Sequence, residues 1–258
     1  MRPVTCLVIV LLVVVACAGQ QHGGGTSLDQ LAAARPAKWL PVPVLAARAP
    51  WVAEVAVQKI SSADAGVRAQ AAFLIGDVGY QAGCGPLKGL LSDPVRKVRM
   101  HAGIALCRLG DPAGVKTAAA VLGGAREWMK YYATVGLWRL GSKEAQQALD
   151  DHAYGQPPLV REAIAAALAQ PAAWTEVAPR TERESVQAKS ADWSRVIDEA
   201  YSAFIAETDW WWHRGYYDQC VRCNDVLVFF DPQADNPYTD SAWLLWSQGR
   251  HTRAIGMY

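Results

Sequence analysis

Residues 98–111 read VRMHAGIALCRLGD, and their pattern occurs four times along the chain without a gap. The copies begin at Val67, Val98, Met129 and Val160, so they follow one another at a constant interval. A fixed period of about 31 residues is typical of proteins built from stacked structural repeats. The structure of one repeat therefore determines that of the whole array.

Each copy places apolar or small residues on one face of a helix. In the copy that begins at Val98, they fall at relative positions 0, 4, 7, 8 and 11, which is the spacing of a buried helical stripe. A glycine follows the last apolar position in three copies, at Gly79, Gly110 and Gly141. Glycine is common just after a helix because it adopts the left-handed conformation without a steric clash. Each of these copies therefore predicts one short helix that ends at its glycine.

A period of this length has room for two short helices and two turns, so each repeat needs a second helix. Matching segments are found at residues 84–91, 115–122 and 146–153, and residues 53–60 fit the same frame one repeat earlier. One hairpin alone cannot cover its apolar stripe, but stacked hairpins bury a continuous core. The chain is therefore predicted to be all-α, with an α-solenoid of about four helical hairpins, degenerate caps and a small aromatic C-terminal module.

The repeat resembles the HEAT repeat. The pattern Val-Arg-x-x-Ala-x-x-x-Leu-x-x-Leu-Gly-Asp in residues 98–111 is similar in particular to the short bacterial HEAT repeats of phycobilin lyase-like proteins, and the resemblance covers residues 51–174. Tetratricopeptide and ankyrin repeats have similar lengths, but their Trp-x-x-Leu-Gly and Thr-Pro-Leu-His signatures are missing from the sequence. The resemblance implies a non-catalytic module for protein binding or scaffolding, with the second helices on its concave side.

The beginning of the chain has the features of a bacterial lipoprotein. Residues 4–16 form an apolar run that is shorter than the ~20 residues of a membrane-spanning helix, and they predict a signal peptide over residues 1–16. The run ends in the sequence VVAC, which resembles a lipobox in which Cys17 is lipidated; the alternative is an ordinary cleavage site, for instance after Ala18. Residues 17–30 are rich in glycine and predict a lipidated flexible tether.

These features also predict a location. A lipidated chain is expected in the bacterial cell envelope, attached to a membrane through its N-terminal lipid. The residue after the cysteine is Ala18 and not an aspartate. In this respect the sequence is similar to lipoproteins that move on to the outer membrane. We therefore expect the protein at the outer membrane, facing the periplasm.

The charge distribution argues against nucleic acid as a partner. The chain has a formal net charge of +1. Residues 63–174 carry twelve Lys and Arg against nine Asp and Glu, a net charge of +3, and residues 175–258 carry eight against thirteen, a net charge of −5. A nucleic-acid-binding protein more often shows a strongly basic face. No catalytic set of residues is evident either, so we expect no enzyme activity and no cofactor.

The repeats are predicted to occupy residues 31–174, including a degenerate N-terminal cap, and residues 175–258 to form the C-terminal module. Residues 181–207 have the apolar spacing of a longer amphipathic helix, expected to lie over the open end of the stack. Residues 226–230 are a short apolar run that is either a strand or a buried turn. Residues 243–246 indicate one last short helix.

The third repeat differs from the others in being aromatic. It has Trp128, Tyr131 and Tyr132 where the other copies have no Trp, Tyr or Phe. Because Trp and Tyr are enriched in interface hot spots, these three residues and Lys116 of the preceding second helix are the predicted protein-binding residues. The expected partner is another protein of the envelope. The alternative is that these aromatic side chains pack against the C-terminal module.

Cys220 and Cys223 form a Cys-x-x-Cys pair, for which a structural disulfide is the first interpretation because exported proteins form disulfides. Half of a metal site is an alternative, with His213 and His251 as the nearby candidates, but their spacing matches no familiar zinc module and no metal is predicted. A redox pair is a further alternative, although no βαβ pattern surrounds the two residues.

The sequence therefore predicts a lipid-anchored scaffold or protein-binding module of the cell envelope that is not an enzyme. The main alternative is a redox- or metal-dependent envelope protein centred on Cys220 and Cys223. A bilin lyase-like activity is more remote, because it would require a cytoplasmic tetrapyrrole pathway and conflicts with export. Cys84 and Cys107 are expected to be buried thiols rather than a second disulfide.

Overall fold

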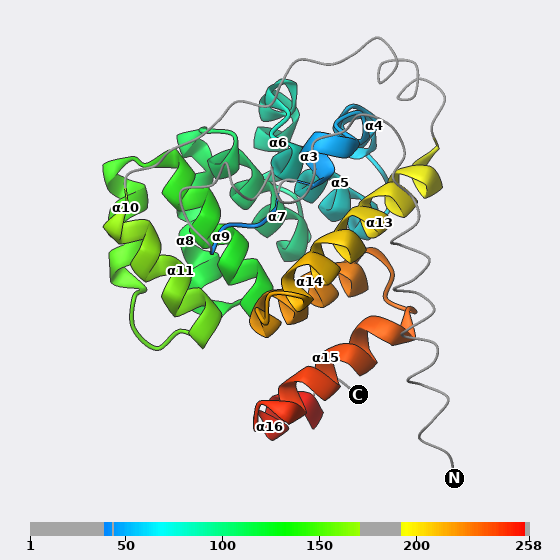
Figure 1. Ribbon diagram of the computed structural model, residues 1–258. Helices are drawn as coiled ribbons and strands as arrows, with labels where there is room; N and C mark the ends of the chain where they lie inside the picture. Colours follow the sequence, from blue (N-terminus) through cyan, green and yellow to red (C-terminus); the bar gives the residue numbers. More distant parts are fainter. Residues whose placement is uncertain (1–38, 43, 171–191, 256–258) are drawn as a thin grey trace.

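The computed structural model of the protein describes residues 39–42, 44–170 and 192–255 (Figure 1). Within these ranges every regular element is a helix, and the prediction of an all-α protein is confirmed. The predicted signal peptide, the lipidation site Cys17 and the tether lie outside the described residues, as does the first part of the helix predicted over residues 181–207.

The middle of the chain is a stack of helical hairpins, as predicted for an α-solenoid (Figure 1). The first helices of the repeats are α5 (Ala65–Val78), α7 (Arg96–Arg108), α9 (Glu127–Leu140) and α11 (Pro158–Ala169). The second helices are α6 (Cys84–Leu90), α8 (Val115–Gly124) and α10 (Lys143–Asp151). Short 3-10 turns precede two of them, η1 (Gln81–Gly83) and η2 (Pro112–Gly114). The stack begins with two cap helices, α3 (Val44–Arg48) and α4 (Val52–Lys59).

Glycine and aspartate mark the ends of the first helices. Gly79, Gly110 and Gly141 have φ angles of 80°, 80° and 61°, in the left-handed region that side chains with a Cβ atom disfavour. At the start of α5, the Asp64 carboxylate accepts a hydrogen bond from the N–H of Gly66 at 2.6 Å. The predicted helix ends are therefore confirmed at all three glycines.

Asp93 links the turns of two successive repeats. Arg68 donates from Nε and Nη2 to its carboxylate at 2.7 and 3.1 Å. Arg99, at the same place in the next repeat, donates to the Asp93 carbonyl oxygen at 2.6 Å. The hydrogen bond from Arg68 lowers the pKa of Asp93, so this link is charged at neutral pH.

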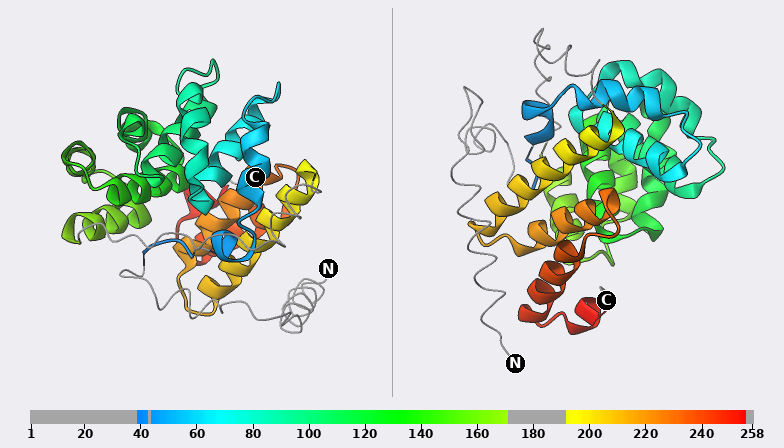
Figure 2. Two further views of the ribbon diagram at one scale, coloured as in Figure 1. Left: turned by 90° about the horizontal axis from the view of Figure 1, so that it is seen from above. Right: turned by 90° about the vertical axis from the view of Figure 1, so that its right-hand side faces the viewer.

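The first helices lie close together because small residues face one another. A Cβ atom on Gly76 of α5 would lie 2.7 Å from Cα and Cβ of Ala105 in α7, and one on Gly136 of α9 would lie 3.1 Å from the carbonyl oxygen of Ile104. The second helices spread apart on the outside of the molecule (Figure 2). The tightly packed face of this stack is thus formed by the first helices, whereas the HEAT resemblance implied that the second helices line the inner side.

The C-terminal module is also helical. It consists of α13 (Trp193–Trp212), α14 (Tyr217–Phe230), α15 (Asp235–Ser247) and α16 (His251–Ile255). Helix α13 extends beyond the predicted end at residue 207, and residues 243–246 lie in a helix as predicted. Residues 226–230 form the last turn of α14, so the prediction of a strand or buried turn was wrong. All five are buried because this end of the helix is covered from several sides, which removes the helical periodicity from the sequence.

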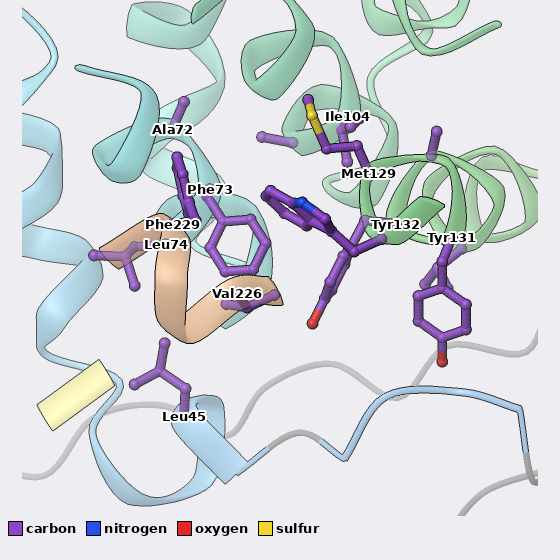
Figure 3. Packing of buried hydrophobic residues seen from close by; sticks show 14 of the residues in the cluster. Leu45, Ala72, Phe73, Leu74, Ile104, Met129, Tyr131, Tyr132, Val226 and Phe229 are labelled. Atoms are coloured by element: carbon purple, nitrogen blue, oxygen red, sulfur yellow. The ribbon is translucent and has the colours of Figure 1, made fainter. Parts of the chain in front are cut away.

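Helix α13 packs mainly on the cap helices α3 and α4, and helix α14 packs on the first helices of the stack (Figures 1 and 3). The ring of Phe73 in α5 lies at the centre of the contact, with its centroid 5.0 Å from Tyr132 in α9 and 5.8 Å from Phe229 in α14. Phe204 of α13 is 5.9 Å away, and His101 of α7 stacks on Phe229 at 4.6 Å. The repeats and the C-terminal helices therefore share one hydrophobic core.

Candidate functional site

The four predicted protein-binding residues lie in two different environments. Lys116 is exposed on α8. Trp128, Tyr131 and Tyr132 of α9 are buried, with exposed fractions of 3%, 0% and 0%. The prediction was therefore wrong for these three residues. They are covered by the C-terminal helices, and the structure bears out the packing alternative.

A buried ion pair joins the two helices that cover the stack. Arg222 of α14 donates from Nη2 to Oε1 of Glu207 in α13 at 2.5 Å. Arg222 also donates to the Tyr132 hydroxyl at 2.6 Å and to the side-chain oxygen of Gln219 at 2.7 Å. The guanidinium carbon lies 5.1 Å from the ring centroid of Tyr131. Arg222 thus has partners on α9, α13 and α14.

The same group of side chains holds the beginning of the described chain. Glu207 accepts a hydrogen bond from the N–H of Val42 at 2.9 Å. The Tyr131 hydroxyl donates to the carbonyl oxygen of Trp39, and the amide of Gln219 donates to the same oxygen at 3.3 Å. We refer to these five side chains as the buried polar network: Arg222, Glu207, Gln219, Tyr131 and Tyr132.

Burial determines the protonation states in this network. Burial disfavours the charged form of Arg222, but Cys223 and Glu207 favour it and the net result is a raised pKa. Burial raises the pKa of the Tyr132 hydroxyl, which stays protonated. Arg222 therefore keeps all its N–H donors near neutral pH. The buried polar network joins helices α9, α13 and α14.

A second buried ion pair connects two repeats. Arg108 of α7 donates to the Asp77 carboxylate of α5 at 2.8 Å, and its guanidinium lies 5.1 Å from the Tyr132 ring centroid. Burial raises the pKa of Asp77, and Arg108 opposes that shift. This pair fixes α5 against α7 beneath the C-terminal helices.

Cys220 and Cys223 lie one turn apart on α14, and both are buried free thiols. The Sγ atom of Cys220 lies 3.6 Å from the carbonyl oxygen of Thr208, and that of Cys223 lies 3.0 Å from Nη2 of Arg222. The disulfide expected from the sequence is not formed in the structure, where both cysteines are free. Burial raises the pKa of Cys220 to about 12 and also raises that of Cys223, which makes both poor nucleophiles.

The remaining predictions about cysteines and metal ligands concern Cys84, Cys107, His213 and His251. Cys84 and Cys107 are free, with Cys107 buried as expected and Cys84 half-buried. His213 and His251 are exposed, whereas the thiols of α14 are buried. Across the described parts of the chain, no three His, Cys, Asp or Glu side chains are grouped so that they could hold a metal ion.

Exposed aromatic side chains gather where α13 ends, α14 begins and α15 passes beside them. The ring of Trp212 is 5.6 Å from that of Tyr217 and 5.9 Å from that of Trp243. Trp243 and Trp246 are 60% and 57% exposed, and Trp246 stacks against His251 at 4.3 Å. We refer to these five residues as the aromatic patch: Trp212, Tyr216, Tyr217, Trp243 and Trp246.

A helix was predicted over residues 243–246, but the position of Trp243 and Trp246 in an exposed patch was not predicted. Leu244 and Leu245 between them are buried. When two consecutive residues of a helix are buried, the residue before them and the residue after them both lie on the side that faces away from the core. The order Trp-Leu-Leu-Trp is thus the signal that could have placed both indoles at the surface.

A second exposed surface is formed by the outer sides of α6, α8 and α10. Leu87, Ala118 and Leu149 turn inward on these helices. The exposed side of these helices carries polar residues, among them Lys88, Lys116, Gln146 and Asp150. We refer to this surface as the second-helix face.

The protein is thus an α-solenoid whose first helices α5, α7 and α9 are covered by its own C-terminal helices. Residues 53–131 and, in an overlapping window, residues 87–169 match the family of HEAT repeats. HEAT repeats indicate a protein-binding or scaffold module. No curated protein matches the chain. In the described part of the chain, no helix has both the length and the apolar character needed to cross a membrane.

Proposed function

We propose that the protein is a lipid-anchored scaffold of the bacterial cell envelope that binds another envelope protein through its second-helix face. The observation that carries this proposal is that the C-terminal helices cover the first helices α5, α7 and α9. A HEAT solenoid offers extended surfaces for partners, and here the second-helix face is a surface that stays open along α6, α8 and α10. Lys116 lies in the middle of that surface.

The lipid anchor is supported by the sequence around Cys17. The apolar run, the VVAC motif and the glycine-rich stretch that follows form the order expected of a bacterial lipoprotein. A diacylated cysteine with a further acyl chain gives stable membrane attachment, whereas one chain would be marginal.

The anchor is tested by replacing Cys17. The Cys17→Ser variant is expected to incorporate no labelled palmitate and to be lost from the membrane fraction. Cys6→Ser is the matched control, because Cys6 lies within the predicted signal peptide and is not expected to be acylated. Equal palmitate incorporation by both variants would show that the anchor lies elsewhere.

The binding surface is tested by charge reversal on the second-helix face. Lys116→Glu is expected to reduce crosslinking to the envelope partner at least several-fold, because it reverses the charge in the middle of the proposed interface. Arg161→Glu is the control, since Arg161 is equally exposed but lies on α11. Full retention of crosslinking by Lys116→Glu would move the interface away from this face.

The redox- or metal-dependent alternative has less support. It needs accessible or reactive thiols at Cys220 and Cys223, and the structure buries both and raises their pKa values. Stoichiometric bound zinc or iron in the purified protein would reinstate it.

A further inference from the structure

We propose that the aromatic patch docks on the surface of the membrane that holds the lipid anchor. This inference rests on the proposed anchor at Cys17 and adds a second contact with the bilayer. Two contacts would fix the orientation of the solenoid relative to the membrane, with the second-helix face available to a partner.

The chemistry of the patch suits the interface between lipid and water. Trp and Tyr rings combine an apolar body with a polar N–H or O–H group, and they concentrate at the level of lipid headgroups. The ring of Trp212 lies next to those of Tyr217 and Trp243, and the three rings come from three different helices. Exposed apolar residues that are scattered singly are ordinary, whereas these rings lie together.

The helices beneath the patch are held firmly. Arg253 of α16 forms ion pairs with Glu127 of α9 and, at 3.5 Å, with Asp225 of α14. Arg250 lies 3.6 Å from Glu127 as well. The rings are therefore presented on a fixed support, and docking requires no refolding of α15 or α16.

Two carboxylates near the patch have basic neighbours. The carboxylate of Asp218 is paired with Arg250, and that of Asp209 lies 3.4 Å from Nδ1 of His213. Arg214 lies over the ring of Trp210 at 3.9 Å. Basic side chains next to tryptophan are typical of protein surfaces at the membrane interface.

The position of the N-terminal segment selects the membrane as the occupant. The carbonyl oxygen of Trp39 is bound by Gln219, which lies in the first turn of α14, two residues after Tyr217 of the patch. Residues 18–38 lie between Cys17 and Trp39, and the 22 steps from Cys17 to Trp39 span at most about 73–79 Å when fully extended. The described chain therefore begins next to the same turn of α14 that carries Tyr217, and a tether of this length lets the anchored membrane reach the patch.

The tether also reduces the affinity that docking requires. A surface held within tens of ångströms of its target has an effective concentration on the order of millimolar. A weak, partial insertion of a few rings is then enough to keep the patch on the membrane. A freely diffusing protein partner would have no such advantage.

Tryptophan fluorescence tests the docking. The lipidated full-length protein is reconstituted in vesicles of phosphatidylethanolamine and phosphatidylglycerol, with and without bromine on the acyl chains. Brominated lipid is expected to quench the exposed indoles of the patch and not the buried ones, such as Trp51, Trp128 and Trp211. The emission of the wild type should fall and shift to shorter wavelength.

Two variants separate docking from general proximity. Trp243→Ser combined with Trp246→Ser should lose most of the quenching, including that of Trp212, which remains as a reporter in the same patch. Tyr154→Ser is the control, because Tyr154 is 92% exposed on the solenoid, in the turn between α10 and α11. It should leave the quenching unchanged.

Three outcomes would contradict the proposal. One is an anchored wild-type protein whose tryptophans are not quenched, and another is equal quenching of the wild type and the double variant. The third is a dimer in detergent that the double variant abolishes, because the patch would then bind a second copy of the chain. Flotation with labelled palmitate measures the anchor separately, so each of these results leaves the proposed anchor intact.

Discussion

Arg222 carries its positive charge at a position that water does not reach. In the sequence it lies between Cys220 and Cys223, and nothing in the local pattern indicates a buried charge. In the structure its guanidinium is shared among Glu207, Gln219 and Tyr132. Removing one partner of a buried ion pair leaves an uncompensated charge, which costs more than the pair itself contributes.

We predict that Arg222→Met lowers the free energy of unfolding by about 3–5 kcal/mol, because Glu207 stays buried without its partner. Urea unfolding measures the loss. Arg161→Met, at an exposed arginine, should change the stability by less than about 0.5 kcal/mol. Adding Glu207→Gln to Arg222→Met should recover part of the loss, since no buried charge remains. A mild effect of Arg222→Met alone would contradict the ion-pair account.

His101 is buried against Phe229, and its Nε2 atom has no hydrogen-bond partner. Burial, with a smaller effect of Lys97, lowers its pKa to about 3. In the unfolded chain the pKa is ~6.5, so between these values the unfolded state binds a proton that the folded state does not. The contribution of His101 to stability is therefore full above pH ~6.5 and is lost as the pH falls towards 3.

The corresponding test compares the wild type with His101→Phe. Phenylalanine keeps the stacked ring and cannot be protonated, so the variant should gain stability relative to the wild type as the pH falls from 7 to 4. Thermal unfolding at several pH values gives this difference directly. A difference between the two proteins that stays constant with pH would show that His101 does not titrate as described.

At the scale of elements, the contact between α5 and α7 depends on the absence of a side chain. Gly76 faces Ala105 so closely that a Cβ atom would overlap the backbone of α7. The same first helices carry Phe73 and His101, which meet the C-terminal helices. The spacing of α5 and α7 therefore determines whether α13 and α14 fit onto the stack.

We expect Gly76→Ala to destabilise the protein by about 1–3 kcal/mol, because α5 and α7 must move apart. Gly89→Ala in α6 is the matched control. Its Cβ atom would meet nothing within 4 Å, and alanine favours a helix, so it should be neutral or stabilising by up to about 1 kcal/mol. Denaturant midpoints of both variants provide the comparison. Equal effects would indicate that the close approach is not rigid.

At the scale of the whole molecule, the repeats and the C-terminal helices form one body. Their buried side chains belong to a single core, and the buried polar network also binds the backbone at Trp39 and Val42. A solenoid alone would unfold repeat by repeat, since each repeat contacts only its neighbours. Here α13 and α14 cross several repeats and couple them.

We predict that the buried cysteines of the repeats and of the C-terminal helices become reactive in a single unfolding transition. Cys107 of α7 and Cys223 of α14 are buried, so alkylation in increasing urea should modify them at the same concentration. Cys84 is half-buried and should react first. Earlier reaction of Cys223 than of Cys107 would show that the C-terminal helices open separately. Failure of Cys220 and Cys223 to react even after unfolding would reveal the disulfide that the sequence analysis favoured.

The sequence alone determined the repeats and their boundaries. The constant repeat period, the apolar stripes and the glycines at 79, 110 and 141 are local features, and the helices they predict form with the expected ends. Local patterns suffice here because, within the stack, each hairpin packs on the hairpins next to it in the sequence. The N-terminal lipoprotein features are likewise visible only in the sequence, and they remain predictions.

Only the tertiary structure decided which surfaces are free. Trp128, Tyr131 and Tyr132 resemble interface residues in the sequence, but α13 and α14 return over the stack and bury them. The same packing makes residues 226–230 the buried end of a helix and separates the thiols of α14 from solvent. These outcomes depend on contacts between residues far apart in the chain, such as Tyr132 with Arg222 and Phe73 with Phe229, and no local pattern specifies such contacts.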